Sequence, residues 1–439
     1  MSLFTTRLLA VVSAGALLVL PAAAAVGSEQ HPAVVSENPA DFTPSLVDTG
    51  PTQEHVNAVA QLGNTMYAGG LFDAVTNGGT NIARDNFMMF NRSTGTVVAS
   101  PAFNDEIWAI ESHGDSVYVG GEFSTVGGVQ RPRLVKLNAD GSVDTSFNAN
   151  LKGGRVLDLH MYRGPGQPRL FVGGTAGTKL MALNPDTGQR DVGFFDLAIT
   201  EPIVHQGVTA FGGVGVSNFA ISPDGSKLVA VGNFTSVNGQ SRRRAFMADL
   251  PASGVGSATL SPWYYEPFND VCASTRARRL AYLSDVDFAP TGNYFVIVAT
   301  GFNPESDDWG THVCDAAARF DTPPVGPLNP TEPKWINYTG GDTIWSVAAT
   351  GAAVYVQGHF QFLDNEFGVG GNPAPTAVTR RGIGALDPDN GEALPWNPGK
   401  PAQMGGKQLL ATSDGLWVAS DSKRFNGEPR HGIAFAPLP

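Results

Sequence analysis

The sequence predicts an all-β protein that folds as a single seven-bladed β-propeller with four-stranded blades. An apolar strand that ends in small residues returns seven times, at intervals of roughly 50 to 65 residues, which is enough for four strands and their loops. Turns rich in Asn, Asp and Gly follow the strands, and these residues tolerate the positive φ of tight hairpin turns. No stretch combines a sustained apolar period of 3.6 residues with helix caps, so we expect few helices.

The first 25 residues have the features of a secretory signal peptide. Arg7 supplies the positive charge, residues 8–20 are an almost unbroken apolar run, and Pro21 leads into the small residues 22–25. The run of about 13 residues is shorter than the roughly 20 residues that span a bilayer. We therefore expect cleavage of residues 1–25, with retention of the segment as an anchor as the alternative.

Residues 26–40 are polar and contain proline, which predicts a flexible lead before a propeller domain at 41–439. No later segment is long and apolar enough to cross a membrane. The net charge is −12 without a basic stripe that could neutralise phosphates, so nucleic acid and anionic lipid are not expected partners. The sequence thus predicts a secreted, extracellular or cell-wall-associated protein with no membrane insertion after signal cleavage. Nothing in it indicates an oligomeric state.

Each repeat contains the same segments in the same order. The copies of the recurring strand are 66–72, 117–123, 170–174, 228–234, 296–302, 354–360 and 416–420. An inner-strand candidate precedes each copy, at 56–60, 107–111, 156–160, 218–222, 286–289, 344–348 and 409–412. A third strand follows, for example at 133–137 and 244–250. A radial propeller is the arrangement that protects the edges of so many short sheets.

The two ends of the sequence predict how the ring closes. The seventh repeat reaches residue 439 directly after its third strand and lacks a fourth. Residues 41–48 resemble the outer strand at 143–148 and likewise precede an inner strand. We therefore expect the N-terminal strand to complete the last blade; a frayed N-terminus beside a three-stranded last blade is the alternative.

The second repeat resembles a known family of repeats. Residues 117–128 (VYVGGEFSTVGG), with 134–138 (LVKLN) and 141–147 (GSVDTSF), are similar to the delta-60 type β-propeller repeat of secreted bacterial proteins, many of them actinobacterial. Residues 233–239 (NFTSVNG) also resemble the propeller of fungal cortical polarity markers. The similarity is sharp in the second and fourth repeats, whereas repeats five to seven depart from it through insertions and lost glycines. The resemblance implies a fold and a compartment, and it carries no activity or catalytic residues.

Long segments are expected to gather on one face of the propeller. Loops 303–313 and 361–381 and linkers 200–215 and 269–279 leave the predicted sheets at the same end, whereas the turns at the other end are short. One elaborated face on a regular scaffold is typical of a binding surface. Neutral drift of the insertions is the alternative.

Cys272 and Cys314 are the only cysteines, and both lie on this predicted face. An even number of cysteines in an exported chain favours a disulfide. The absence of a CxxC motif gives little support to a redox or zinc role.

The inner strands should begin at the elaborated face, so their first residues are expected to ring the mouth of the central channel. Candidate ligand-binding residues there are Asp105, Glu106, Arg155, Asp285 and Asp342. An acidic mouth suits a hard cation such as Ca²⁺, which takes six to eight oxygen ligands. Solvated charges at strand ends are the simpler interpretation, so no cofactor is predicted and calcium stays an alternative.

The loop at 303–312 is the second candidate site, because it contains Asp307, Asp308, Trp309 and His312. Carboxylates beside an aromatic ring suit a carbohydrate, and a carboxylate pair could serve acid–base chemistry on a glycosidic bond. A polar surface loop held by the disulfide is the alternative.

Two further observations bear on function. Trp108 and Trp345 occupy equivalent inner-strand positions and are predicted to pack between blades rather than to form a ligand cage. The sequence has no GxSxG, HExxH or Walker motif, so catalytic and metal-binding residues are left unassigned. The preferred function is a secreted or envelope-associated recognition module that presents loops to a glycan, an envelope polymer or an extracellular protein. The alternative is an extracellular glycan hydrolase or lyase with carboxylates at the channel mouth.

Overall fold

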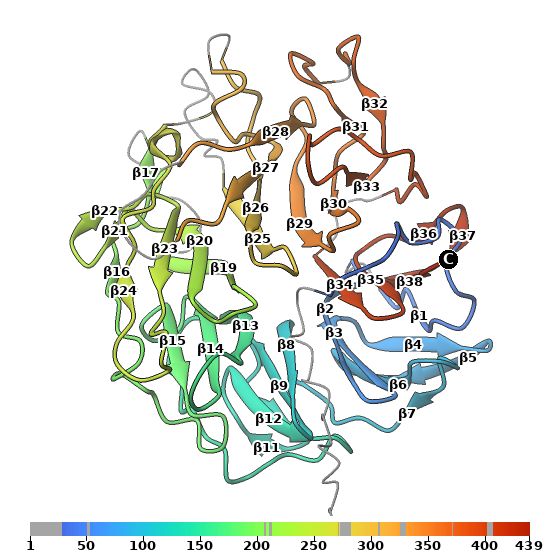
Figure 1. Ribbon diagram of the computed structural model, residues 1–439. Helices are drawn as coiled ribbons and strands as arrows, with labels where there is room; N and C mark the ends of the chain where they lie inside the picture. Colours follow the sequence, from blue (N-terminus) through green and yellow to red (C-terminus); the bar gives the residue numbers. More distant parts are fainter. Residues whose placement is uncertain are drawn as a thin grey trace, which may run out of the picture.

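The computed structural model describes residues 29–50, 53–205, 208–209, 213–270, 272, 282–305, 308–324, 331–370, 372–401 and 407–439. The predicted all-β class is confirmed, because these residues form β-strands and one short 3₁₀-helix, η1 (Glu266–Asn269). The predicted signal segment lies outside the described residues. Figure 1 shows the sheets arranged as sectors around a central axis.

Seven antiparallel meander sheets follow one another along the described chain. The first contains β2 (His55–Leu62), β3 (Thr65–Leu71), β6 (Phe87–Asn91) and β7 (Val97–Val98). The second contains β8 (Ile107–His113), β9 (Ser116–Gly121) and β12 (Leu134–Asn138), and the third β13 (Val156–Tyr162), β14 (Arg169–Gly174) and β15 (Leu180–Leu183). The fourth contains β19 (Gly215–Ile221), β20 (Lys227–Asn233), β23 (Ala245–Asp249) and β24 (Thr259–Leu260).

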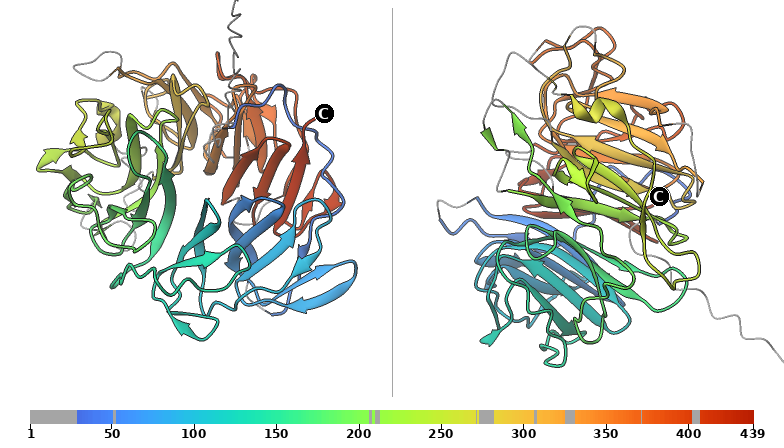
Figure 2. Two further views of the ribbon diagram at one scale, coloured as in Figure 1. Left: turned by 60° about the horizontal axis from the view of Figure 1, so that its bottom comes forward. Right: turned by 90° about the vertical axis from the view of Figure 1, so that its left-hand side faces the viewer.

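The remaining three sheets complete the series. The fifth contains β25 (Leu283–Phe288), β26 (Tyr294–Ala299), β27 (Ala316–Asp321) and β28 (Trp335–Tyr338). The sixth contains β29 (Ile344–Ala349), β30 (Val354–Gly358) and β33 (Ile383–Leu386), and the seventh β34 (Gln408–Thr412), β35 (Gly415–Ala419) and β38 (Ile433–Pro437). The first strands lie side by side in this order, and β34 in turn contacts β2 (Figures 1 and 2).

A fourth strand is present in only three of these sheets: the first, fourth and fifth. In the second sheet a single bridge between Leu137 and Val143 stands in its place. Beyond this bridge, the side chain of Asp144 accepts hydrogen bonds from the backbone N–H and the hydroxyl of Ser146 (2.9 and 2.6 Å). Such local side-chain hydrogen bonds compete with backbone hydrogen bonds between strands. The outer segment predicted at 143–148 therefore pairs with β12 at one point only.

Small hairpins extend from five of the sheets between the second and third strands, where the sequence predicted loops. They are β4 (Ala74–Asn77) with β5 (Thr80–Ala83), β10 (Thr125–Val126) with β11 (Val129–Gln130), β21 (Ser236–Val237) with β22 (Gln240–Ser241), β31 (Phe362–Leu363) with β32 (Val378–Thr379), and β36 (Arg424–Phe425) with β37 (Glu428–Pro429). β16 (Ile199–Thr200) joins β21, and β17 (Val204–His205) pairs with β18 (Val208–Thr209).

The N-terminal segment differs from its prediction in the pairing of its strand. Its strand β1 (Ser45–Leu46) pairs with β4 rather than with the seventh sheet. The segment still runs beside β38, where backbone N–H groups of Ser36, Ala40 and Leu46 donate to carbonyl oxygens of Pro437, Phe435 and His431 (Figure 2). Pro44 has no N–H to donate, so these bonds do not become a continuous ladder.

Residues 29–40, predicted to be part of a flexible lead, are also bonded to the sheets. The backbone N–H of His31 donates to the Thr350 carbonyl oxygen (2.9 Å), and that of Val35 to the Tyr355 hydroxyl (2.9 Å). Val35 is buried in an apolar cluster with residues of the sixth and seventh sheets. The described part of the lead therefore connects these two sheets.

Two adjacent glycines in the recurring strand have separate packing roles. At Gly120, an added Cβ would collide with Val156 of the next sheet, so the first glycine of the pair permits close approach between sheets. At Gly121, an added Cβ would overlap the Glu106 carbonyl oxygen of its own sheet. The second glycine faces a β-bulge in the first strand, a position where backbone approaches closely. The same overlap with backbone is present at Gly70, Gly174, Gly232 and Gly358.

A positive φ recurs directly before the third strand of every one of the seven sheets. The residues are Asn86, Arg133, Lys179, Arg244, Asp315, Gly382 and Gly432. Because non-glycine residues rarely adopt this conformation, its recurrence indicates that the seven sheets are structurally equivalent repeats.

Replacing the glycine opposite the bulge should destabilise the protein. We expect Gly121→Ala to lower the free energy of unfolding by about 1–3 kcal/mol, because the new methyl group overlaps backbone that cannot move without breaking the bulge. Gly50→Ala is the control, since a Cβ at Gly50 has no atom within 4 Å. Denaturant titration of both variants would contradict this account if they lost the same stability.

Candidate functional site: an axial pocket

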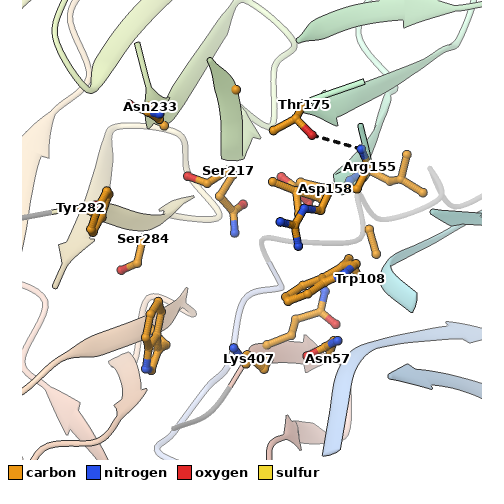
Figure 3. Close-up of a pocket in the computed structure, with 18 of the residues that line it drawn as sticks. Asn57, Trp108, Arg155, Asp158, Thr175, Ser217, Asn233, Tyr282, Ser284 and Lys407 are labelled. Carbon is orange, nitrogen blue, oxygen red and sulfur yellow. Dashed lines mark hydrogen bonds between the residues drawn. The ribbon is translucent and has the colours of Figure 1, made fainter. Parts of the chain in front are cut away.

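The bulges direct one side chain from each of six first strands toward the central axis. The residues skipped by the strand registers are Asn57, Trp108, Leu157, Ser217, Ser284 and Trp345. All six line one pocket of about 370 Å³ (Figure 3). Lys407 directly precedes Gln408, the first paired residue of β34, just as Trp345 directly precedes the paired Ser346 in β29. Lys407 lines the same pocket. All seven sheets thus contribute to one cavity.

The pocket lies at the end of the sheets that carries the long loops. The start of each first strand pairs with the end of the second, as His55 does with Leu71. The hairpins described above also leave from this end. A ligand in the pocket would therefore be surrounded by the most elaborated segments of the chain.

Three of the bulged side chains connect neighbouring sheets. Asn57 Nδ2 donates to the Ile107 carbonyl oxygen (2.8 Å), and Ser284 Oγ to that of Ile344 (2.7 Å). Ser217 Oγ lies 3.5 Å from the Leu283 carbonyl oxygen. These bonds join consecutive first strands through side chains, because the strands themselves form no ladder with each other.

The two tryptophans flank the lysine. Lys407 Nζ lies 5.0 Å from the Trp345 ring centroid and 5.6 Å from that of Trp108, within cation–π range. Both indole rings are half-buried and line the pocket, whereas the sequence predicted that they pack between blades. The β-bulge is the physical reason, because its extra residue breaks the alternation of side chains between the two faces of a regular strand.

Arg155 lies on the other side of the Trp108 ring, with its guanidinium carbon 5.7 Å from the ring centroid. Its Nη1 pairs with Glu122 Oε1 at 2.7 Å, and Trp108 Nε1 donates to the same oxygen at 3.3 Å. This cation is therefore already neutralised by a carboxylate. Among the described residues predicted as ligand-binding, Arg155 alone belongs to the pocket lining.

Carboxylates deeper along the axis bond to the backbone of neighbouring sheets. Asp158 Oδ2 accepts the Phe219 N–H (2.8 Å) and Asp285 Oδ2 the Val347 N–H (2.9 Å). Asp285, predicted to stand at the channel mouth, therefore connects two sheets. Burial raises its pKa to about 8, although the backbone bonds oppose this shift.

The same region holds an imidazole that pairs with Asp158. His160 Nε2 lies 3.4 Å from Asp158 Oδ2. Burial disfavours the imidazolium, but Asp158, with Glu111 and Asp287, outweighs that effect and raises the pKa of His160 to about 9. Burial also raises the pKa of Asp287 well above its usual value. Protons are therefore retained along the axis near neutral pH.

The other predicted mouth residues lie outside the pocket lining. Asp105 is exposed. Glu106 Oε1 accepts bonds from His55 Nε2 (2.9 Å) and Asn57 Nδ2 (2.8 Å). Burial disfavours its carboxylate, but these bonds outweigh burial and lower the pKa of Glu106. Asp342 lies 3.6 Å from His359 Nδ1, and burial raises its pKa.

The second predicted site, the loop of the fifth sheet, is separate from the pocket lining. Trp309 packs on Tyr338 and Phe367, with ring centroids 4.8 and 5.2 Å away. His312 is buried between Asp270 (3.4 Å) and Asp308 (3.7 Å). Asp307 lies outside the described residues. The described part of the loop is thus largely engaged in its own packing.

The predicted disulfide is confirmed. Cys272 and Cys314 are bonded to each other and are both buried, 42 residues apart in the chain. The described residues contain no group of three or more His, Cys, Asp or Glu side chains placed to hold a metal ion. Within the same residues, no helix is long and apolar enough to cross a membrane.

Comparison with known proteins supports a β-propeller family. A family described as "Domain of unknown function (DUF5122) beta-propeller" matches residues 115–147, which span the strands β9 to β12 and the outer segment of the second sheet. No curated protein matches the chain.

Solved structures show only distant similarity. The crystal structure of the computationally designed Ika8 protein is 12% identical, with 90% of this chain and 98% of that chain covered and a TM-score of 0.45. Kuenenia stuttgartiensis hydrazine synthase is 13% identical, with 72% and 79% covered and a TM-score of 0.40. At these TM-scores neither similarity carries an argument about this protein.

Removing the disulfide should lower stability without changing the fold. The chain-entropy relation for a separation of 42 residues gives about 4 kcal/mol, so Cys272→Ser with Cys314→Ser should melt at a lower temperature than the oxidised protein. A reductant should lower the Tm of the natural protein and leave that of the double variant unchanged. Equal melting of the oxidised and reduced natural protein would contradict a stabilising bond.

Stability should decline as pH rises from 5 to 9. The folded-state pKa values of His160, about 9, and Asp285, about 8, exceed the ordinary values near 6.5 and 3.9. At these two groups the folded protein therefore binds more protons than the unfolded chain in this range, and the contribution of each group to stability is lost as pH rises through its folded pKa.

Asp285→Asn tests whether the Asp285 carboxyl contributes to this decline in stability, because the substitution keeps an acceptor for the Val347 N–H and removes the titratable group. We expect its Tm to fall less between pH 5 and pH 9 than that of the natural protein. Asp105→Asn, at an exposed position, serves as the control and should keep the natural slope. Parallel slopes for Asp285→Asn and the natural protein would show that Asp285 does not retain its proton.

Proposed function

We propose that this protein is a secreted or cell-envelope-associated recognition module that binds a glycan in its axial pocket. The proposal includes a cleaved signal peptide at 1–25, a closed seven-bladed propeller at 41–439, and kinship with secreted bacterial delta-60 repeat proteins. Seven equivalent sheets with adjacent first strands, and a disulfide of the kind found in oxidising compartments, support it.

The observation that carries the proposal is the pair of indole rings in one pocket. Trp108 and Trp345 come from different sheets and both line the cavity, alongside polar groups such as Asn218. Flat apolar rings beside a few fixed polar groups are typical of sites that hold the face of a small, hydroxylated ligand. A volume of about 370 Å³ is in the range of small-molecule sites.

The contacts favour binding over hydrolysis. A glycosidase needs two carboxylates free to act on one bond, about 5–10 Å apart. Asp158, which lines the pocket, and Asp285, which follows the lining residue Ser284, instead accept hydrogen bonds from the backbone of adjacent sheets. We therefore prefer recognition as the function and keep a hydrolase or lyase as the alternative.

Binding of the chain from Val26 onward to an array of glycans and bacterial envelope polymers tests this function. We expect saturable binding that Trp345→Ala or Trp108→Ala weakens by about fivefold or more, since stacking on an aromatic ring contributes about 1 kcal/mol or more. Calcium should have little effect.

Trp309→Ala is the matched control, because it removes an indole from the peripheral loop and leaves the pocket lining intact. Loss of binding in Trp309→Ala with retention in Trp345→Ala would move the site to the loop. Shortened sugars in the bound fraction would identify an enzyme, and a blank array would leave a protein partner as the function to test.

A further inference from the structure

Lys407 is the cation of the axial pocket that forms no ion pair with any residue that the structure describes. It lies directly before β34, at the position that the bulged residue holds in the other six sheets, and its backbone N–H donates to the Ala419 carbonyl oxygen (3.1 Å). Among the described residues, its ammonium forms no ion pair and no hydrogen bond, and its contacts are the two indole faces. Arg155, by contrast, is already paired with Glu122.

The carboxylates that act on this ammonium, Glu106 and Asp421, form no ion pair with it. Glu106 acts on it electrostatically, but its Oε1 is held by His55 and Asn57. Asp158, elsewhere in the lining, is paired with His160 and with the Phe219 N–H. Burial consequently lowers the pKa of Lys407, with Glu106 and Asp421 opposing the shift.

A desolvated ammonium without a paired anion is costly for the empty protein, and an anion that enters the pocket would relieve that cost. The flanking indoles restrict what can bring this charge, because they present flat apolar surfaces rather than further cations. A lone inorganic anion would have no flat apolar face to pack against the two rings. A carboxylate attached to a sugar ring would satisfy the lysine and the rings together.

We propose that the glycan recognised here is acidic, and that the carboxylate of a uronic-acid-type sugar pairs with Lys407 while its ring packs on Trp345 and Trp108. The inference rests on the proposed function, since it names the chemical class of the ligand in the same pocket. Lys407 is the specificity-determining residue, and the indoles supply affinity for sugars in general.

The test compares two ligands that differ only in charge: an oligogalacturonate and the same oligosaccharide after reduction of its carboxyl groups. Titration calorimetry should give about 10- to 100-fold tighter binding of the acidic form, the range for a hydrogen bond to a charged group. Lys407→Met should remove this preference, and Lys407→Arg should keep part of it. An oligosaccharide whose only charges are sulfate esters, as a third arm, should bind less well than the uronate.

Lys152→Met is the matched control, because it deletes an exposed lysine in the linker before β13. It should preserve the preference for the acidic ligand, which separates a local pairing from a change in net charge. The preference should also weaken as pH rises through the lowered pKa of Lys407. Thermal melting of each variant shows whether it is folded.

The outcomes separate this inference from the function on which it rests. Equal affinity for the acidic and reduced ligands, with loss of both in Trp345→Ala, would overturn the acidic preference and keep glycan recognition. A preference that persists in Lys407→Met would also overturn the assignment. Binding of neither ligand, nor of any other saccharide, would overturn both proposals.

Discussion

The β-bulge near the start of the first strand is the constraint on which the rest of the molecule depends. In the second sheet, Trp108 is inserted between the paired residues Ile107 and Ala109, and the backbone comes so close to Gly121 that no side chain fits there. The bulge interrupts the alternation of side chains between the two faces of the strand and directs one extra side chain toward the axis. Its neighbour Gly120 lets the next sheet approach, so one dipeptide sets both the site and the spacing of the sheets.

Packing of the first strands around an axis leaves their inner edges without a backbone partner. Such edges carry unpaired N–H and C=O groups that must be satisfied when buried. Asp158, Asp285 and Glu111 meet this need by accepting N–H groups of Phe219, Val347 and Met161 from adjacent sheets. The acidic residues of the axis are therefore explained by architecture, and the raised pKa of Asp285 is a consequence of its burial.

The two surfaces predicted to bind a ligand differ in how their side chains are used. Around the fifth sheet, Trp309 and His312 are engaged in packing and ion pairs near the disulfide. In the axial pocket, Trp345 and Lys407 face a cavity shared by all seven sheets. Side chains that face a cavity can contact a ligand without losing contacts within the protein. Side chains that hold a loop in place would first have to break their contacts with that loop.

The sequence by itself determined the all-β class, the repeat order and the disulfide. These features depend on local patterns, such as the paired glycines at 120–121, and on Cys272 and Cys314 being the only cysteines. The equivalence of Trp108 and Trp345 was also visible, and it was the signal that both share one environment. The seventh repeat gave no comparable signal at Lys407, because Ser420 stands where five of the six bulged sheets have a glycine.

Only the tertiary structure decided which way these residues point and what they meet. A bulge shifts a side chain to the other face by one residue, which a period-two pattern cannot anticipate. The pairing of β1 with β4 likewise depended on a hairpin from the first sheet and on Pro44, which interrupts bonding to β38. The pocket exists because seven distant segments converge on one axis, and convergence is a property of packing rather than of any single segment.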